Sequence, residues 1–327
     1  MSTTPTVSVV IPAYKAAPFI GETLDSVFKQ SFTDYEVIIV NDGSPDTPDL
    51  ERVLQPYMNR IRYIKQKNLG AAAARNEGLR AAKSGLIAFL DSDDLWLPEY
   101  LDQQLKFLRE QDCDLVCADA DVFGDAPDAG GTYMENLMAS APPTGQVSFL
   151  ELVSSERSLI TSGVVARRDL IFKVGLFDEA LRNAQDFDLW LRLAHSGARL
   201  AYQRHVLLRY RTRANSLTGD ATNSLIRELR VLDKIQHSYN LTAEERAEVF
   251  PVIRSRQAIL QFELGKHLVA RGDIEPARTA FSKADRSRRS WKTQTAIWFS
   301  RLAPGPMQAL CLRRLQPKAS DAGGTRA

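Results

Sequence analysis

Short apolar runs alternate with helical segments through the first part of the chain, and this alternation restricts the fold more than any other feature. Four runs have the composition of buried strands: residues 7–11, 35–40, 61–64 and 86–90. Helical patterns lie between them, at residues 18–28, 50–57 and 70–83. Strands that alternate with helices form a doubly wound, largely parallel sheet. Ligands of such sheets bind beyond the carboxyl ends of the strands.

An acidic triplet, Asp91-Ser92-Asp93, follows the fourth apolar run. Asp91 and Asp93 are spaced i, i+2 after a strand, so their carboxylates point to the same side. Two such carboxylates can hold one hard divalent cation, which in turn can bind a diphosphate. The neighbouring Asp94 is expected to cap a helix that starts near Leu95. An acidic triplet alone is weak evidence, so its weight depends on the motifs that accompany it.

The remaining pattern predicts further elements of the same domain. We expect a helix over 98–110, a strand over 114–122, a mobile surface loop over 123–144, strands over 164–166 and 207–212, and a helix over 187–196. After about residue 223 the pattern changes to continuous helix. The histidines have no ligand spacing, so no zinc site is expected.

Charge is unevenly distributed along the 327 residues, although the net charge is only +2. Residues 1–241 carry 26 Lys and Arg against 32 Asp and Glu, whereas residues 242–327 carry 16 against 8. The three cysteines form no C-x-x-C motif, which fits a reducing compartment. No apolar run reaches the ~18 residues that span a bilayer. We therefore expect a cytoplasmic protein.

Five motifs in sequence order resemble those of the family 2 glycosyltransferases. They are Val-Ser-Val-Val-Ile-Pro-Ala-Tyr (7–14), Val-Asn-Asp-Gly-Ser (40–44), Gly-Ala-Ala-Ala-Ala-Arg-Asn-Glu-Gly (70–78), Asp-Ser-Asp-Asp (91–94) and Gln-Asp-Phe-Asp-Leu-Trp-Leu-Arg (185–192). The resemblance covers about residues 5–217. It implies the GT-A nucleotide-sugar-binding fold, a Rossmann-like mixed and mostly parallel sheet, here with a C-terminal α-helical appendage.

The resemblance implies a donor site for a nucleoside-diphosphate sugar, with uridine as the default base. The donor-binding residues would be Pro12, Ala13, Tyr14, Asp42, Arg75, Asp91 and Arg211. Tyr14 can frame the base or simply pack, and Asp42 can accept from the ribose or form an Asx turn around Gly43. Arg75 adds a positive charge near the diphosphate. Arg211 can close over the donor or form a surface ion pair.

The resemblance also assigns the metal ligand and the base. Asp93 would bind Mg²⁺ or Mn²⁺ directly, and Asp91 would contact ribose or a metal-bound water. Asp186 would accept the proton of the acceptor hydroxyl. Related enzymes usually carry an acidic residue before this aspartate, where this chain has Gln185. Asp188 is the rival base, and it faces another side of the helix.

The leading hypothesis is an inverting, metal-dependent glycosyltransferase (EC 2.4 class) that acts on a saccharide or lipid-linked acceptor in polysaccharide or glycoconjugate synthesis. A nucleotidyltransferase is disfavoured because Pro12-Ala13-Tyr14-Lys15 stands where that class has a Gly-rich loop. No Walker-type loop is present. The alternative from another class is a non-catalytic nucleotide- or carbohydrate-binding scaffold with a helical docking region.

We predict three parts: a catalytic domain (1–223), a helical region (224–316) and a disordered tail (317–327). The helical region contains one tetratricopeptide-like helix pair with Gly272-Asp273 as its turn, which serves either as a cap or as a docking surface. Its end combines aromatic residues with seven basic and no acidic residues over 286–314. This composition suits a membrane surface at the inner face of the membrane, with a buried helix edge as the alternative. No nucleic acid is expected.

Overall fold

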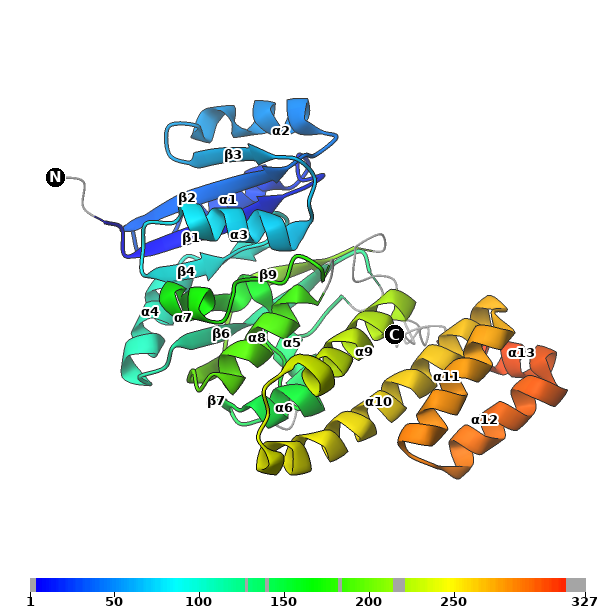
Figure 1. Cartoon of the computed structure of the whole chain (residues 1–327). Helices are drawn as coiled ribbons and strands as arrows, with labels where there is room; N and C mark the ends of the chain where they lie inside the picture. Colours follow the sequence, from blue (N-terminus) through cyan, green and yellow to red (C-terminus); the bar gives the residue numbers. More distant parts are fainter. Residues whose placement is uncertain (1–3, 127–128, 139–140, 182–183, 214–220, 316–327) are drawn as a thin grey trace, which may run out of the picture. The chain divides into compact units, whose positions relative to one another are not determined.

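The computed structural model describes residues 4–126, 129–138, 141–181, 184–213 and 221–315, and the predicted tail lies outside them. The chain forms two compact units, residues 1–216 and 217–327 (Figure 1). Over the described ranges, no helix combines the length and the apolar character needed to cross a bilayer.

The first unit is built on one mixed sheet of nine strands. In spatial order it runs β3-β2-β1-β4-β8-β6-β9-β5, and β7 pairs with β9 (Figure 1). The strands are β1 (Val7–Ala13), β2 (Tyr35–Asp42), β3 (Arg62–Gln66), β4 (Leu86–Phe89), β5 (Leu95–Trp96), β6 (Leu115–Gly124), β7 (Thr144–Val147), β8 (Val164–Arg167) and β9 (Leu200–Thr212). The predicted mixed sheet is confirmed.

Strand directions bring several loops to one edge of this sheet. β1 is parallel to both β2 and β4, so the carboxyl ends of these three strands meet. β8 is antiparallel to β4, so the residues before β8 reach the same edge. β5 pairs with the end of β9 through Leu95 and Arg209. Loops that are distant in sequence are therefore neighbours at this edge.

Eight helices and two 3-10 turns accompany the sheet in the described part of the first unit. They are α1 (Ile20–Phe28), α2 (Thr47–Leu54), α3 (Ala71–Ala81), α4 (Tyr100–Glu110), α5 (Tyr133–Met138), α6 (Phe149–Ser154), α7 (Arg168–Lys173) and α8 (Gln185–His195), with 3-10 turns η1 (Gln55–Tyr57) and η2 (Thr161–Gly163). Helix α3 lies against β1 and β2. There the missing side chain of Gly78 matters, because a Cβ would come within 2.4 Å of a Val10 methyl carbon.

Two sequence predictions are wrong. The segment 123–144 is not wholly a surface loop, because it contains α5, whose Met134 and Met138 are buried. Thr132 and Glu135 hydrogen-bond each other's backbone at the start of that helix, as in a capping box. Asp94 caps no helix, since β5 follows it. The Gly, Pro and Asp content of residues 123–144 hid helix α5, and the shortness of β5 hid the strand after Asp94.

The second unit contains five helices in the described part of the chain. They are α9 (Ala221–Ser238), α10 (Ala243–Arg271), α11 (Ile274–Ser287), α12 (Trp291–Leu302) and α13 (Pro304–Leu315). Gly272, with φ of 88°, ends α10 and allows the tight turn into α11. A small core joins the last four helices through Val269, Ala277, Phe281, Ala296 and Cys311.

Candidate active site

The 3-10 turn η2 links the acidic triplet to the predicted base. The Ser162 hydroxyl accepts from the backbone N–H of Asp91 at 3.0 Å and donates to Asp94 Oδ2 at 2.5 Å. The hydroxyl of the preceding Thr161 donates to Asp186 Oδ2 at 2.8 Å. Two adjacent residues therefore hold the triplet and Asp186 at the same edge of the sheet.

The base candidate Asp186 stands in the first turn of α8. It is half-buried, and its second oxygen accepts from the backbone N–H of Phe187 at 2.8 Å. The helix dipole favours a negative charge at this end. Ala184, just before the helix, has a φ of 59°, which is strained for a residue with a side chain. Such strain is common where a side chain must be aimed at a site.

The rival Asp188 has a structural role. Its side chain is fully buried and forms an ion pair of 2.8 Å with Arg192, which also donates to the backbone oxygens of Val174 and Leu176. Trp190 is likewise buried, against Phe89. These residues fix α8 in place.

Arginines surround the triplet. Arg75 of α3 donates to Asp91 Oδ1 at 2.5 Å, and its side chain is only 6% exposed. Its Nε and Nη1 find no acceptor among the described residues. Arg213 donates to Asp93 Oδ2 at 2.7 Å. Buried guanidinium donors beside carboxylates are suited to an anionic ligand such as a phosphate.

Arg211 approaches the same triplet from the end of β9. Its backbone N–H donates to Asp94 Oδ1 at 2.8 Å and its Nε to the backbone oxygen of Asp93 at 2.9 Å. Its Nη2 forms a 2.7 Å ion pair with Glu22. The ion-pair alternative for Arg211 is therefore present in the structure, while its role toward the donor stays a prediction.

Burial and repulsion disfavour charge on two of these carboxylates. The pKa of Asp93 is raised, first by burial and then by the charge of Asp91. The pKa of Asp94 is raised well above its usual range, first by complete burial and then by the charge of Asp93. Asp91 and Asp93 thus lie close enough to repel each other, and a cation between them would remove that repulsion.

Asp42 holds the loop that leads into α3. One of its oxygens accepts from Gln66 Nε2 and from the N–H of Leu69, and the other accepts from the N–H of Gly70. The Asp42 carboxylate thus bonds to this loop rather than forming the alternative Asx turn around Gly43, and the following turn is held by Asn41 Oδ1, which accepts from the Ser44 N–H three residues on. A sugar or base contact of Asp42 remains a prediction.

The end of β1 is shaped by a neighbouring loop. β1 continues through Pro12 to the buried Ala13, and Tyr14 is 45% exposed. Ser44 Oγ accepts from the Lys15 N–H at 2.7 Å, which fixes the backbone beside Tyr14. An exposed ring on a fixed backbone is available to stack on a base.

Sequence reasoning overlooked four residues of this edge. Thr161 and Ser162 carry no motif and become visible only when β8 is placed beside β4. Asp94 was misread because a strand rather than a helix follows it. Arg213 had a usable signal, since Arg211 and Arg213 are spaced i, i+2, as are residues on one side of a strand.

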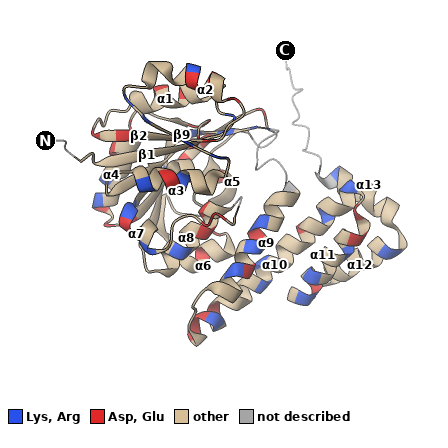
Figure 2. Ribbon diagram, turned by 45° about the horizontal axis from the view of Figure 1, so that its top comes forward, with Lys and Arg blue, Asp and Glu red and all other residues tan. Residues whose placement is uncertain are grey.

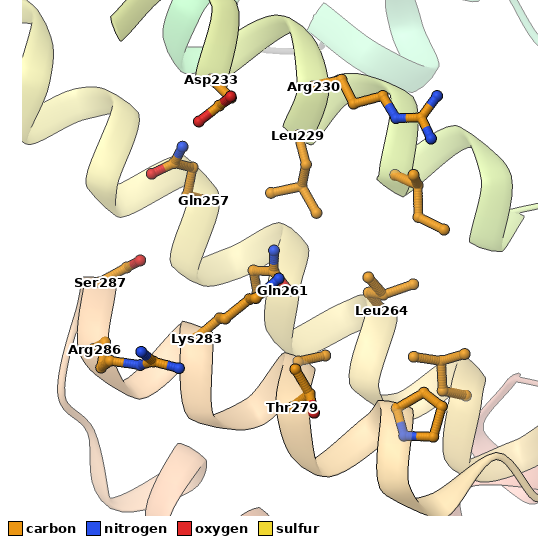
Figure 3. A pocket seen from close by; sticks show the side chains of 14 residues that line it. Leu229, Arg230, Asp233, Gln257, Gln261, Leu264, Thr279, Lys283, Arg286 and Ser287 are labelled. Atoms are coloured by element: carbon orange, nitrogen blue, oxygen red, sulfur yellow. The ribbon is translucent and has the colours of Figure 1, made fainter. Parts of the chain in front are cut away.

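The second unit has a concave feature of its own. A groove of about 840 Å³ lies between α9, α10 and α11, and Figure 3 shows the side chains that face it. Its floor is apolar, with Leu229, Leu264 and Leu268. Lys283 and Arg286 of α11 add positive charge.

Comparisons with known proteins relate the first unit to a family of enzymes. A family model described as Glycosyl transferase family 2 matches residues 8–156. The match lies within the first unit and bears out the resemblance to family 2 glycosyltransferases. An uncharacterized glycosyltransferase from Rickettsia bellii is 30% identical over 58% of this chain and 27% of its own length. The putative teichuronic acid biosynthesis glycosyltransferase TuaG of Bacillus subtilis is 42% identical over 33% of this chain and 44% of its own.

Solved structures show that this chain has the GT-A fold. S. aureus TarS 1-349 in complex with UDP-GlcNAc has a TM-score of 0.65 at 18% identity, covering 94% of this chain and 89% of that one. The mannosyltransferase PcManGT of Pyrobaculum calidifontis, in complex with GDP-Man and Mn²⁺, has a TM-score of 0.61 at 17% identity, covering 96% and 85%. The predicted fold class and the predicted resemblance to family 2 glycosyltransferases are confirmed.

Proposed function

We propose that this chain is an inverting glycosyltransferase that moves a hexosyl group from a nucleoside-diphosphate sugar to a saccharide or lipid-linked acceptor in polysaccharide or glycoconjugate synthesis. The observation that carries the proposal is the η2 turn, whose adjacent residues Thr161 and Ser162 hydrogen-bond to the Asp186 carboxylate and to the backbone of Asp91. A base and a diphosphate-binding group side by side are what a displacement at the anomeric carbon requires.

The reaction follows from these positions. The acceptor oxygen forms a bond to the anomeric carbon while the bond from that carbon to the diphosphate breaks. Asp186 takes the acceptor's proton, and the bonding electrons leave with the diphosphate. Arg75 stabilises the charge that develops there, because its Nε and Nη1 are buried donors without a protein acceptor in the described ranges.

The donor set fits a single Mg²⁺ or Mn²⁺ ion shared with the substrate. Within the described ranges, no three His, Cys, Asp or Glu side chains cluster as a metal site. Mg²⁺ in phosphoryl sites needs only one or two carboxylates, with phosphate oxygens as further ligands. Asp93 would bind the ion, with Asp91 nearby, and the ion would neutralise the leaving diphosphate.

We further propose uridine as the base, since the similar TarS structure holds UDP-GlcNAc. Pro12, Ala13, Tyr14 and Asp42 would form the nucleoside part of the site. The compartment would be the cytoplasm, which fits three buried, free cysteines. Residues 1–223 would carry catalysis, and the helical residues 224–316 would support it.

The test is consumption of a panel of UDP-, GDP- and dTDP-sugars by the purified full chain, with Mn²⁺ or with EDTA. One donor should release its nucleoside diphosphate, EDTA should stop the release, and added Mn²⁺ should restore it. The exposed Asp102 on α4 provides a matched control, and Asp102→Asn should behave as wild type. Failure to consume any donor, with saccharide and lipid extracts supplied, would contradict the proposal.

The second candidate is a scaffold that binds a nucleotide or carbohydrate without turnover. The groove between α9, α10 and α11 favours the docking part of this candidate. The same donor panel separates the two functions. A scaffold would bind a nucleoside diphosphate without consuming its sugar.

A further inference from the structure

The last two helices of the second unit expose large apolar side chains. Six such residues lie within 22 positions, with exposed fractions from 41% to 73%: Trp291, Trp298, Phe299, Leu302, Leu310 and Leu312. The described part of the first unit buries its tryptophans, at 3% for Trp96 and 1% for Trp190. Exposed apolar side chains that gather in this way mark an interaction surface.

Helix α12 is apolar on the side away from its own core. Its inner side, Thr293, Ala296 and Ser300, is buried. Trp291, Trp298 and Leu302 recur at intervals of seven and four residues, so they form one row on the opposite side. The outer row therefore contributes nothing to the core of the helical unit.

Positive charge borders this row. Lys292 and Arg301 lie on its two flanks by helical position. Neither α12 nor α13 contains an acidic residue, so the charged positions on both are blue in Figure 2. Trp298 also contacts the Phe299 ring, at 5.1 Å between centroids, which joins the row to a second exposed aromatic.

We propose that the outer side of α12 docks on an anionic membrane surface. An aromatic row flanked by cations is the arrangement of a helix that lies in the interface plane of a bilayer. A second copy of this chain fits less well, because the same cations would face each other. The docking does not depend on sugar transfer, although it would hold the enzyme where a lipid-linked acceptor is found.

Vesicle flotation tests the proposal with the full chain. Binding is expected to vesicles of phosphatidylcholine with phosphatidylglycerol, weakly to phosphatidylcholine alone, and less as salt is raised. The triple variant Trp291→Ser, Trp298→Ser, Leu302→Ser should lose about tenfold or more in binding. Replacing Lys292 or Arg301 with Gln should cost about fivefold each. Ile259→Ser removes an apolar residue of α10 that is 51% exposed, and it should leave binding unchanged.

Tryptophan emission gives a second reading of the same contact. Because Trp96 and Trp190 are buried, a blue shift on adding anionic vesicles should come from Trp291 and Trp298 and be lost in the triple variant. Unchanged flotation of that variant would overturn the proposal. So would a blue shift that follows protein concentration without vesicles, which would identify a second copy as the partner. Nucleoside diphosphate binding, measured in parallel, would show whether the donor site is intact in either case.

Discussion

The two units of this chain treat polar and apolar side chains in opposite ways. The first unit buries Asp94 and Arg75 at the carboxyl edge of the parallel strands and keeps its described tryptophans inside. The second unit has a small apolar core and leaves Trp291 and Trp298 exposed. Burying a charge is costly unless partners compensate for it, and exposing an indole is costly unless something covers it. We therefore expect the first unit to act at the edge that contains Asp94 and Arg75, and the second unit to act through the surface that contains Trp291 and Trp298.

The largest expected effect concerns the base. Asp186→Asn keeps the shape and the Thr161 contact but removes the proton acceptor, so kcat should fall by roughly 1,000-fold. Donor affinity and the melting temperature should stay close to wild type. Sugar transfer under saturating donor measures the effect. If the variant retained the wild-type kcat, a residue other than Asp186 would be the base.

A matched substitution two residues away should affect stability instead. Asp188→Asn leaves Arg192 without its carboxylate in a site where the aspartate is fully buried. Losing one partner of a buried pair costs about 3 kcal/mol of unfolding free energy. Urea denaturation measures the loss, and kcat per folded molecule should be retained. Unchanged stability together with lost turnover would indicate that Asp188 is the base and that Asp186 has the structural role.

The core of the helical unit can be tested separately. A Cβ on Gly265 would lie 2.4 Å from a ring carbon of Phe281, so Gly265→Ala should destabilise the second unit by about 2 kcal/mol. Gly305→Ala in α13 meets nothing within 4 Å and serves as the control. Thermal unfolding measures both variants. Nucleoside diphosphate binding should be the same in each, and a loss of binding would mean that the units are coupled.

The smallest effect lies at the edge of the sheet opposite the site. Burial raises the pKa of Asp114, but hydrogen bonds from Arg199 outweigh it, so the pKa is lowered overall. The ionised Asp114 therefore stabilises the folded chain above about pH 4, which is the pKa of an aspartate in the unfolded chain. This stabilisation is lost as the pH falls through the lower pKa of the folded state. Asp114→Asn should reduce the loss of unfolding free energy at acid pH by less than about 1 kcal/mol. Urea denaturation at a series of pH values measures this loss. The same loss in the variant and the wild type would show that the pair of Asp114 and Arg199 does not contribute.

The fold could be predicted from the sequence where local patterns and tertiary packing agree. The buried strands β1, β2 and β4 are nearly continuous apolar runs, so their positions and their shared carboxyl edge followed directly. Helix α5 was missed because Gly, Pro and Asp surround it, although the Thr132 to Glu135 spacing carried a capping signal.

The site could be predicted only in part for a related reason. Local spacing indicated Asp91 and Asp93 as a pair of carboxylates after a buried strand, whereas the resemblance to family 2 glycosyltransferases indicated Asp186 and the role of Asp93. The η2 turn carries no such signal, because the importance of Thr161 and Ser162 depends on β8 running antiparallel beside β4. Pairing between distant strands cannot be derived from local residue spacing.

Calorimetric titration of UDP into the full chain, with and without Mn²⁺, tests the central claim most directly when wild type is compared with Asp93→Asn. Binding that requires Mn²⁺ in the wild type and falls by about tenfold or more in the variant is the predicted result, because Asp93 would hold the ion that binds the diphosphate. Equal, metal-independent binding by both proteins would contradict the assignment of the acidic triplet as the donor site.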